Sequence, residues 1–362
     1  MRGGMDAIAT ALTDSWSFVH SHLMQLGGGT GRPFWYFAAG SFINVARDYL
    51  WFLGMGLVIF ALFVRKRGER FSPWAGIKYL LPLEIYRTPS VRVDLMMVPI
   101  QGVLNFVLFA GLAIGSGVGQ IWLVEQFGHV PWTVHAPWLA VTLQIVFTML
   151  GTDVARFAWH YQAHKVPFFW EFHKGHHSAE ALHPVFLRTH PVDMFIRLVY
   201  MNIGGGVFGG ALMYVAGVDA SAAAAHGLLT IGLIIHFLQQ FEHSHVVFSS
   251  GRVLDRIFYS PHFHRIHHSA RLEHRDKNLG FTGGLCLWDR LAGTLYVPKP
   301  GEQLVFGASL EELGENNPHR TLWRFLSGPF VAAAKTLGRR PPPLFDPQVT
   351  GAGGGRCPSA AP

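Results

Sequence analysis

The sequence predicts an all-α integral membrane protein, a helical bundle with four to five transmembrane helices, and three observations lead to this fold class. First, half of the 362 residues are hydrophobic and only 14% are Asp, Glu, Lys or Arg, against about 25% in soluble globular proteins. Second, the apolar residues form long blocks with few or no charges, as lipid-crossing helices require. Third, basic residues gather in the connections between those blocks, a bias typical of membrane proteins.

Five blocks are long enough to cross the hydrocarbon core, which takes about 20 apolar residues. They comprise residues 42–64, 95–124, 137–159, 198–218 and 220–241. The first contains Arg47 and Asp48 near its start and is the weakest of the five, so the expected count is four or five. Only Asp219 separates the last two blocks, which predicts a tight helical hairpin. We expect no N-terminal signal peptide, because residues 1–26 lack a continuous apolar core.

The distribution of basic residues predicts the orientation of these helices. Seven Lys and Arg residues lie between Arg65 and Arg92, whereas the connections at 125–136 and at Asp219 contain none. Because cytoplasmic loops carry the excess of Lys and Arg, the loop after the first block is predicted to be cytoplasmic. Counting crossings from there places residues 160–190 and everything after residue 243 on the cytoplasmic side. We expect an N-terminal anchor with its basic loop at 1–94, a main domain at 95–300, and an extension at 301–362 that is disordered from about residue 339.

Histidine is the unusual component of the composition. Of the 21 histidines, 16 lie between His160 and His274, and many of them fall in the segments HYQAH (160–164), HKGHH (173–177) and HRIHH (264–268). On a helix, positions i, i+3 and i+4 share one face. Each segment therefore aims two or three imidazoles at one point, and the predicted topology brings all three to the same membrane surface. The fold class thus includes a cytoplasmic, histidine-rich helical cap.

This pattern predicts a metal centre. Neutral imidazole suits iron, zinc, copper and nickel, and eight cluster histidines exceed what one tetrahedral ion uses, so we expect two ions. A ninth ligand is expected from the end of the fifth block. The predicted ligands are His160, His164, His173, His176, His177, His243, His264, His267 and His268. The two cysteines, Cys286 and Cys357, are too few for a disulfide framework, a cysteine-ligated zinc module or a cysteine-ligated iron–sulfur cluster.

A second set of residues is ranked below these ligands or expected to support them. His236 lies seven residues before His243, a spacing that puts both on one helix face. His190 neighbours the second cluster. Asp153 either accepts the N–H of a ligand imidazole or pairs with Arg156 on its own helix. Asp276 and Asn278 either cap a helix or bind a ligand imidazole, and capping is favoured. His226, in mid-block, and His183, off the cluster spacing, are left out of the site.

The motifs around these histidines resemble the fatty acid hydroxylase and sterol desaturase superfamily of membrane di-iron enzymes. The resemblance runs from about residue 153 to 297, and several blocks occur in the family's order. These are WHYQAH (159–164), FHKGHHS (172–178), RTHP (188–191), FEHS (241–244), PHFHRIHHS (261–269), DKNLG (276–280) and WDRLAGT (288–294). Tyr161, His245 and Leu279 depart from the residues that many relatives carry. The resemblance implies two iron ions held by the histidine clusters, O₂ as co-substrate and a lipid substrate, and it makes 95–300 the catalytic domain.

The chemistry can also be argued from the residues. Attack on an unactivated C–H bond needs a redox-active metal, which favours iron over redox-inert zinc. The expected function is an O₂-dependent lipid hydroxylase or desaturase, and its electrons must come from a separate reductase through a ferredoxin or cytochrome, because the chain has no haem-attachment or cluster-binding motif. The alternatives are a membrane metal-binding or transport protein and a di-iron relative that performs another lipid oxidation. Nucleic acid is excluded as a partner, because the net charge of +7 includes no long basic run.

Overall fold

The structure is a computed structural model. It describes residues 33–184, 188–219, 222–246, 249, 251, 253–299, 301–307 and 320–337, and within these it leaves out the side chains of 33–41, 102–118, 121, 222–229 and 233. The disordered tail expected from residue 339 and the N-terminal residues 1–32 lie outside the described part of the chain.

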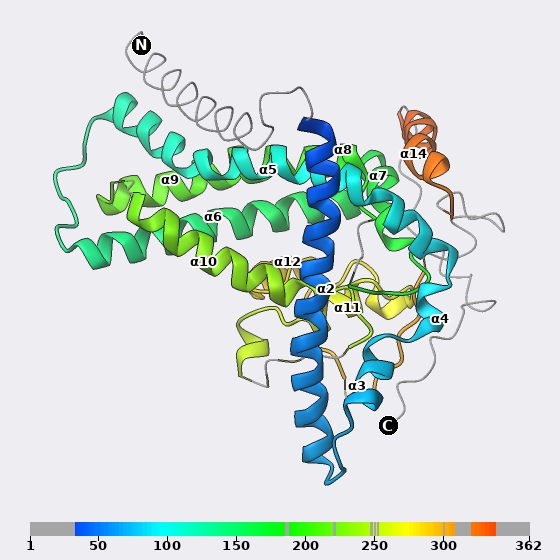
Figure 1. Cartoon of the computed structure of the whole chain (residues 1–362). Helices are drawn as coiled ribbons and strands as arrows, with labels where there is room; N and C mark the ends of the chain where they lie inside the picture. Colours follow the sequence, from blue (N-terminus) through cyan, green and yellow to red (C-terminus); the bar gives the residue numbers. More distant parts are fainter. Residues whose placement is uncertain are drawn as a thin grey trace. The chain divides into compact units, whose positions relative to one another are not determined.

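The regular secondary structure of the described residues is helical and contains no strand, as predicted; the only β-like feature among them is an isolated bridge between Phe258 and Leu285 (Figure 1). The longer helices are α2 (Pro33–Lys66), α5 (Pro89–Phe127), α6 (Pro137–Lys165), α9 (Gly205–Ala216), α10 (Ala222–Gln239) and α14 (Leu322–Thr336). The shorter ones are α3 (Pro73–Leu80), α4 (Leu83–Tyr86), α7 (Pro167–His177), α8 (Pro191–Val199), α11 (Pro261–His267) and α12 (Leu287–Ala292). A π-helical turn, η1 (Tyr200–Gly204), joins α8 to α9.

Three described helical stretches are long and apolar enough to cross a membrane: Phe42–Lys66, Pro137–Lys165 and Pro191–Ala216. They correspond to the first, third and fourth predicted blocks. The second and fifth blocks fall on α5 and α10, where residues 102–118 and 222–229 have no described side chains. The chain is therefore a helical membrane protein with at least three candidate spans, and the count of four to five stays a prediction.

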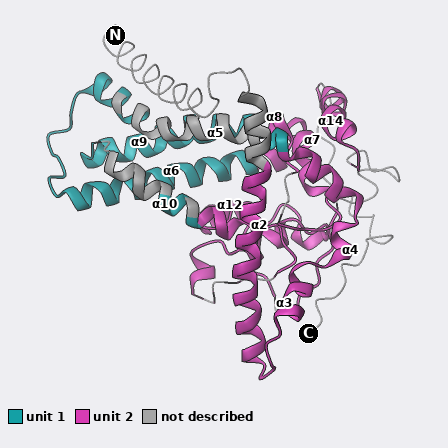
Figure 2. Cartoon of the chain, in the orientation of Figure 1, with its two compact units in different colours: residues 1–41, 99–160, 194–234 teal, residues 42–98, 161–193, 235–362 magenta. Residues whose placement is uncertain are grey.

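The chain forms two compact units, each assembled from separate parts of the sequence (Figure 2). The first unit takes residues 1–41, 99–160 and 194–234, and the second takes 42–98, 161–193 and 235–362. In the second unit, Phe52 of α2 packs against Leu80 and Phe241 in one apolar cluster, and Tyr259, Phe263 and Cys286 form another around α11. The second unit carries most of the histidine-rich segments.

In the first unit, glycines let neighbouring helices approach closely, as the small-residue spacing in 204–210 indicates. A Cβ added to Gly151 of α6 would lie 2.4 Å from the carbonyl oxygen of Gly205, and one added to Gly119 of α5 would lie 2.4 Å from that of Gly206. Helices α6 and α9 consequently run side by side (Figure 1). Gly204, Gly206 and Gly209 match the G-x-G-x-x-G pattern of dinucleotide-binding loops, which follows a strand. Here these glycines are preceded by helix and belong to a helix-packing surface.

Candidate metal centre

The histidine segments of the second unit lie on two short helices and the end of a long one. Helices α7 and α11 both begin with a proline at their first position, where its fixed φ favours helix initiation and its missing N–H costs nothing. Each helix ends on its histidines: α7 at His177 and α11 at His267, with His268 as the cap residue. His164 is on the last turn of α6. His243 follows α10 and is half-buried.

The ring nitrogens of eight histidines of the second unit gather into two groups, and within each group they all lie within 4.8 Å of one another. The first group contains His164, His173, His177 and His267, and the second contains His176, His243, His264 and His268. His160 is fully buried and precedes His164 by one turn of α6, on the same helix face. Eight of the nine predicted ligands thus fall into these two groups.

The two groups interleave, which differs from the expectation that each cluster aims at a single point. In HKGHH, His173 and His177 enter the first group and His176 the second. In HRIHH the assignment is reversed, because His264 and His268 enter the second group and His267 the first. The i and i+4 imidazoles stay together, whereas the i+3 imidazole, about 60° away around a helix of 3.6 residues per turn, turns to the neighbouring group. The rings of His177 and His268, one from each group, stack with centroids 4.5 Å apart.

Oxygen atoms outside the groups fix which nitrogen of each ring faces inward. The Nδ1 atoms of His173 and His164 lie 2.9 Å and 3.3 Å from carboxylate oxygens of Asp193 and Asp276. The Nδ1 atoms of three more histidines lie 3.0–3.4 Å from carbonyl oxygens: His176 from Arg188, His264 from Gly280, and His267 from Lys277. Because an oxygen acceptor requires the proton on Nδ1, the Nε2 lone pair of each ring is directed inward, the arrangement that orients histidine ligands in metal sites.

Inside the groups, Nε2 atoms approach one another directly. His243 lies 3.3 Å from His176 and 3.0 Å from His268, and His264 lies 3.1 Å from both His243 and His268. In the first group, the Nε2 atoms of His173 and His177 are 3.3 Å apart. Lone pairs facing each other at these distances repel unless a cation lies between them, so the donor set fits a bound metal ion. Imidazole nitrogen is suited to iron and other first-row transition metals.

Burial keeps these imidazoles in the neutral form that binds metals. Desolvation lowers the pKa of His176, His177, His243, His267 and His268 well below the usual value, and the neighbouring imidazoles lower it further. A proton therefore does not compete for these nitrogens at neutral pH.

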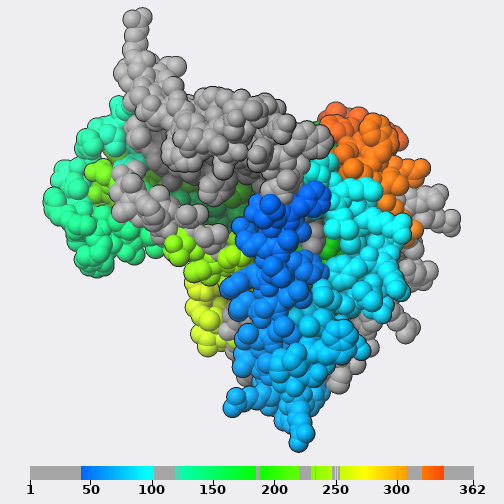
Figure 3. Space-filling view, viewed as in Figure 1, coloured from blue at the N-terminus to red at the C-terminus, as the bar shows by residue number. Residues whose placement is uncertain are grey.

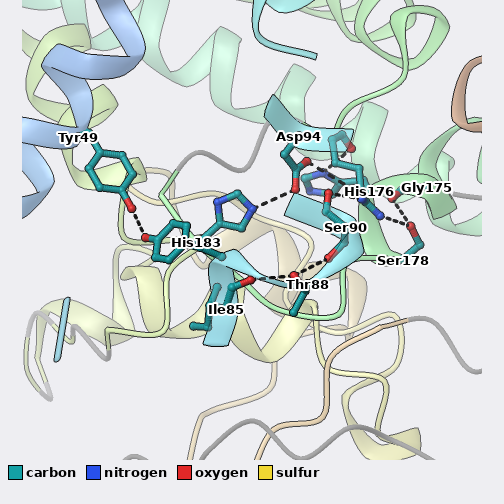
Figure 4. Close-up of polar contacts among 11 residues, drawn as sticks. Tyr49, Ile85, Thr88, Ser90, Asp94, Gly175, His176, Ser178 and His183 are labelled. Carbon is teal, nitrogen blue, oxygen red and sulfur yellow. Dashed lines mark hydrogen bonds and ion pairs between the residues drawn. The ribbon is translucent and has the colours of Figure 1, made fainter. Parts of the chain in front are cut away.

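A buried ion network that sequence reasoning missed supports the second group (Figure 4). Asp94, from the first turns of α5, accepts a hydrogen bond from His183 (3.0 Å) and lies 3.5 Å from the Arg188 guanidinium. All three side chains are completely buried. Arg188 also donates to the Ser178 hydroxyl (3.0 Å) and to the Ser90 carbonyl (2.6 Å), while its own carbonyl faces His176. Asp94 and His183 occupy no cluster spacing, so no sequence signal indicated them.

The residues of the second predicted set have varied roles. Asp276 contacts His164 and Lys165. Burial would raise the pKa of its carboxyl group, but these two partners lower it to about 2. Asn278 donates to the carbonyl groups of Phe263, on α11, and Tyr296, and it accepts from the Tyr296 amide. Both residues have positive φ angles and neither is the N-cap of a described helix, so the favoured capping role is wrong.

His190 and His236 bond outside both groups. The Nε2 atom of His190 donates to the Leu326 carbonyl on α14, and its Nδ1 accepts from the Val192 amide. His236 pairs with Asp48 of α2 at 3.1 Å. Asp153 is half-buried on α6, and its role in orienting a ligand stays a prediction. The side chain of His226 lies outside the described residues.

The fold and the paired histidine groups define a class: a helical membrane protein with a polyhistidine metal-binding centre. Residues 145–294 match the fatty acid hydroxylase family, and all nine predicted ligands fall within them. The match confirms the resemblance seen in the sequence motifs.

Three curated relatives also match this chain. Alkylglycerol monooxygenase of Homo sapiens is 26% identical over 224 residues, which cover 60% of this chain and 44% of the relative. The ornithine lipid hydroxylase OlsE of Rhizobium tropici is 28% identical over 159 residues, 44% of this chain and 43% of the relative. The Danio rerio alkylglycerol monooxygenase is 28% identical over 189 residues, 52% of this chain and 36% of the relative. The chain thus spans less than half the length of these relatives, and no solved structure matches it significantly.

Proposed function

We propose that the chain is a membrane-bound di-iron oxygenase that inserts oxygen into, or desaturates, a lipid with O₂ and external electrons. The observation that carries the proposal is the pair of converging imidazole groups inside the segment that matches the fatty acid hydroxylase family. The relatives' names, an alkylglycerol monooxygenase and an ornithine lipid hydroxylase, favour a lipid substrate and hydroxylation over desaturation.

The histidines are assigned to two iron ions as follows. One ion is held by His164, His173, His177 and His267, with His160 as a further ligand supplied by the preceding turn of α6. The other is held by His176, His243, His264 and His268. Bound iron would supply the O₂ activation and C–H oxidation that side chains lack.

The chain's own residues prepare the site for that chemistry. Asp193 holds the Nδ1 proton of His173 and so keeps Nε2 free to bind a metal. The carbonyl groups of Arg188, Gly280 and Lys277 do the same for three other rings. The rings of the second unit's ligands other than His243 are at most 8% exposed, which excludes bulk water from the site.

Hydroxylation places one oxygen atom of O₂ in the substrate and releases the other as water, which takes two electrons and two protons. We propose that a separate ferredoxin or cytochrome, with its reductase, delivers the electrons. The positive-inside bias of the loop after the first span supports a site that faces the cytoplasm, where such a donor can reach it.

The decisive experiment compares the lipids of cells that express the chain, its His176→Ala variant or its His262→Ala variant. His262 lies on α11 with the ligands but belongs to neither group, so it is the matched control. We expect a lipid with one added oxygen atom, or two fewer hydrogens, only in the native and His262→Ala cells, and about two irons per purified chain. Retained metal without any lipid product would instead indicate a metal-handling protein, and an active preparation that holds only zinc would contradict the proposal.

The same purified variants test the division of ligands between the ions. His176→Ala removes a ligand of the second group alone and should leave about one iron per chain. His177→Ala, at the neighbouring position in the first group, should do the same. Equal metal loss in His262→Ala would refute the ligand assignment.

A further inference from the structure

Helix α14 follows the family-matched segment and packs against α7, the helix that carries three of the site histidines. Phe325, Pro329 and Ala333, spaced by four residues, form its buried face. The ring of Phe330 contacts Phe172 of α7 at 5.2 Å between centroids. His190, which precedes α8 and contacts Phe172, donates a hydrogen bond to the Leu326 carbonyl. These contacts hold α14 against α7.

The face of α14 turned away from α7 is also apolar. Trp323 is 76% exposed, Val331 61% and Leu337, just past the helix, 67%. Phe330 lies at the edge of this face and is 54% exposed. Figure 3 shows α14, in orange, at the surface of the molecule. Helix α14 thus buries one apolar face and exposes a second one, and an exposed apolar face of this kind marks a site of contact with a membrane or another protein.

The charged residues of α14 and of the sequence that flanks it have a single sign. Between Glu315 and Asp346 the sequence contains no Asp or Glu but five basic residues, namely Arg320, Arg324, Lys335, Arg339 and Arg340. Arg320 pairs with Glu180, whereas Arg324 and Lys335 are exposed on α14. Exposed Trp and Phe beside Lys and Arg are typical of helices that lie in the interface of an anionic membrane.

We propose that α14 is an interfacial helix that lies in the headgroup region of the membrane crossed by the candidate spans. Trp323, Phe330, Val331 and Leu337 enter the boundary of the acyl chains, and Arg324 and Lys335 contact anionic headgroups. These features favour a membrane as the occupant, because the same chain already carries three candidate spans and the exposed basic side chains complement anionic lipid. Through its contacts with α7, the docked helix would hold the histidine groups next to the lipid surface. The position of α14 does not depend on the reaction that the site performs.

The test places a fluorophore on the exposed face in the full-length protein. Cys357→Ser removes one native cysteine, and Cys286 is completely buried, so Val331→Cys provides a single accessible thiol for an environment-sensitive dye. The labelled protein is reconstituted into vesicles of phosphatidylcholine, with or without phosphatidylglycerol. We expect blue-shifted emission that lipids with a nitroxide near the headgroup quench, and stronger quenching when the anionic lipid is present.

Two variants of the labelled protein test whether the effect of phosphatidylglycerol depends on the basic residues of α14 or on surface charge elsewhere. Arg324→Glu with Lys335→Glu should abolish the extra quenching caused by phosphatidylglycerol, whereas Arg256→Glu, at an exposed arginine outside α14, should leave it unchanged. Emission typical of water in both kinds of vesicle would overturn the proposal. Blue-shifted emission that no nitroxide lipid quenches, together with cross-linking between copies through residue 331, would assign the face to a second copy of the chain and also overturn it.

Discussion

Neutralising Asp94 should strongly destabilise the protein. Asp94→Asn keeps the shape of the side chain but leaves the Arg188 guanidinium, which is completely buried, without its counter-charge. For two unit charges separated by 3.5 Å, Coulomb's law at an effective dielectric constant of about 20 gives roughly 5 kcal/mol. Removing one partner of a buried pair typically costs about 3–5 kcal/mol, and we expect Asp94→Asn to fall in that range.

The assay uses the buried thiol of Cys286. In a Cys357→Ser background, the rate and midpoint of its labelling by a thiol-reactive dye in detergent report unfolding. Asp48→Asn is the matched control, because Asp48 forms a comparable pair with His236 whose imidazole is 43% exposed; that change should cost about 1 kcal/mol or less.

A double-mutant cycle with Arg188→Met isolates the charge pair from the other contacts of each residue. Once Arg188 is absent, Asp94→Asn should cost at least about 2 kcal/mol less than it does in the native background. Additive effects, or an Asp94→Asn variant as stable as Asp48→Asn, would refute the reasoning.

Three further predictions test other parts of the structure. Asp193→Asn replaces the carboxylate that holds the Nδ1 proton of His173 and should weaken metal binding about 10–100-fold, measured by competition with a chelator; unchanged affinity would contradict its positioning role. Gly151→Ala should markedly lower the melting temperature, because its Cβ would meet the Gly205 carbonyl at 2.4 Å, whereas Gly54→Ala, with nothing within 4 Å of its Cβ, should not. The metal-free protein should lose stability as the pH falls below about 6.5, by up to roughly 1.4 kcal/mol per pH unit for each site histidine that is neutral when folded and protonated when unfolded. Its melting temperature in chelator should therefore drop between neutral and mildly acidic pH, and a flat profile would contradict the lowered pKa values.

The sequence predicted the histidines of the centre because helix periodicity is local. The spacing in HKGHH and HRIHH is enough to place two imidazoles four residues apart on one face, and the contacts within α7 and α11 follow it. The division of each segment between two groups was not predictable, because it depends on how α7 and α11 are packed. That packing is tertiary information, which a spacing rule does not contain.

Contacts between distant residues account for the other misses. Asp94 meets His183 across 89 residues of sequence, and His190 meets α14 across 136. Neither pairing produces a periodic pattern in the sequence. The sequence also does not distinguish a metal ligand from a histidine such as His190, whose two ring nitrogens both bond to the backbone. Asp276 was expected to cap a helix by residue preference, but its positive φ angle turns it toward His164 instead.

The interleaving of the two histidine groups has a consequence for how the centre is assembled. Both HxxHH helices contribute imidazoles to each histidine group, so, under the proposed assignment of two ions, the first cation to bind would already fix both helices in the arrangement that the second cation needs. The entropic cost of ordering α7 and α11 would then lower the affinity for the first cation much more than the affinity for the second. In the native protein, with all eight imidazoles present, two cations would therefore bind cooperatively, and the form with one cation would be poorly populated.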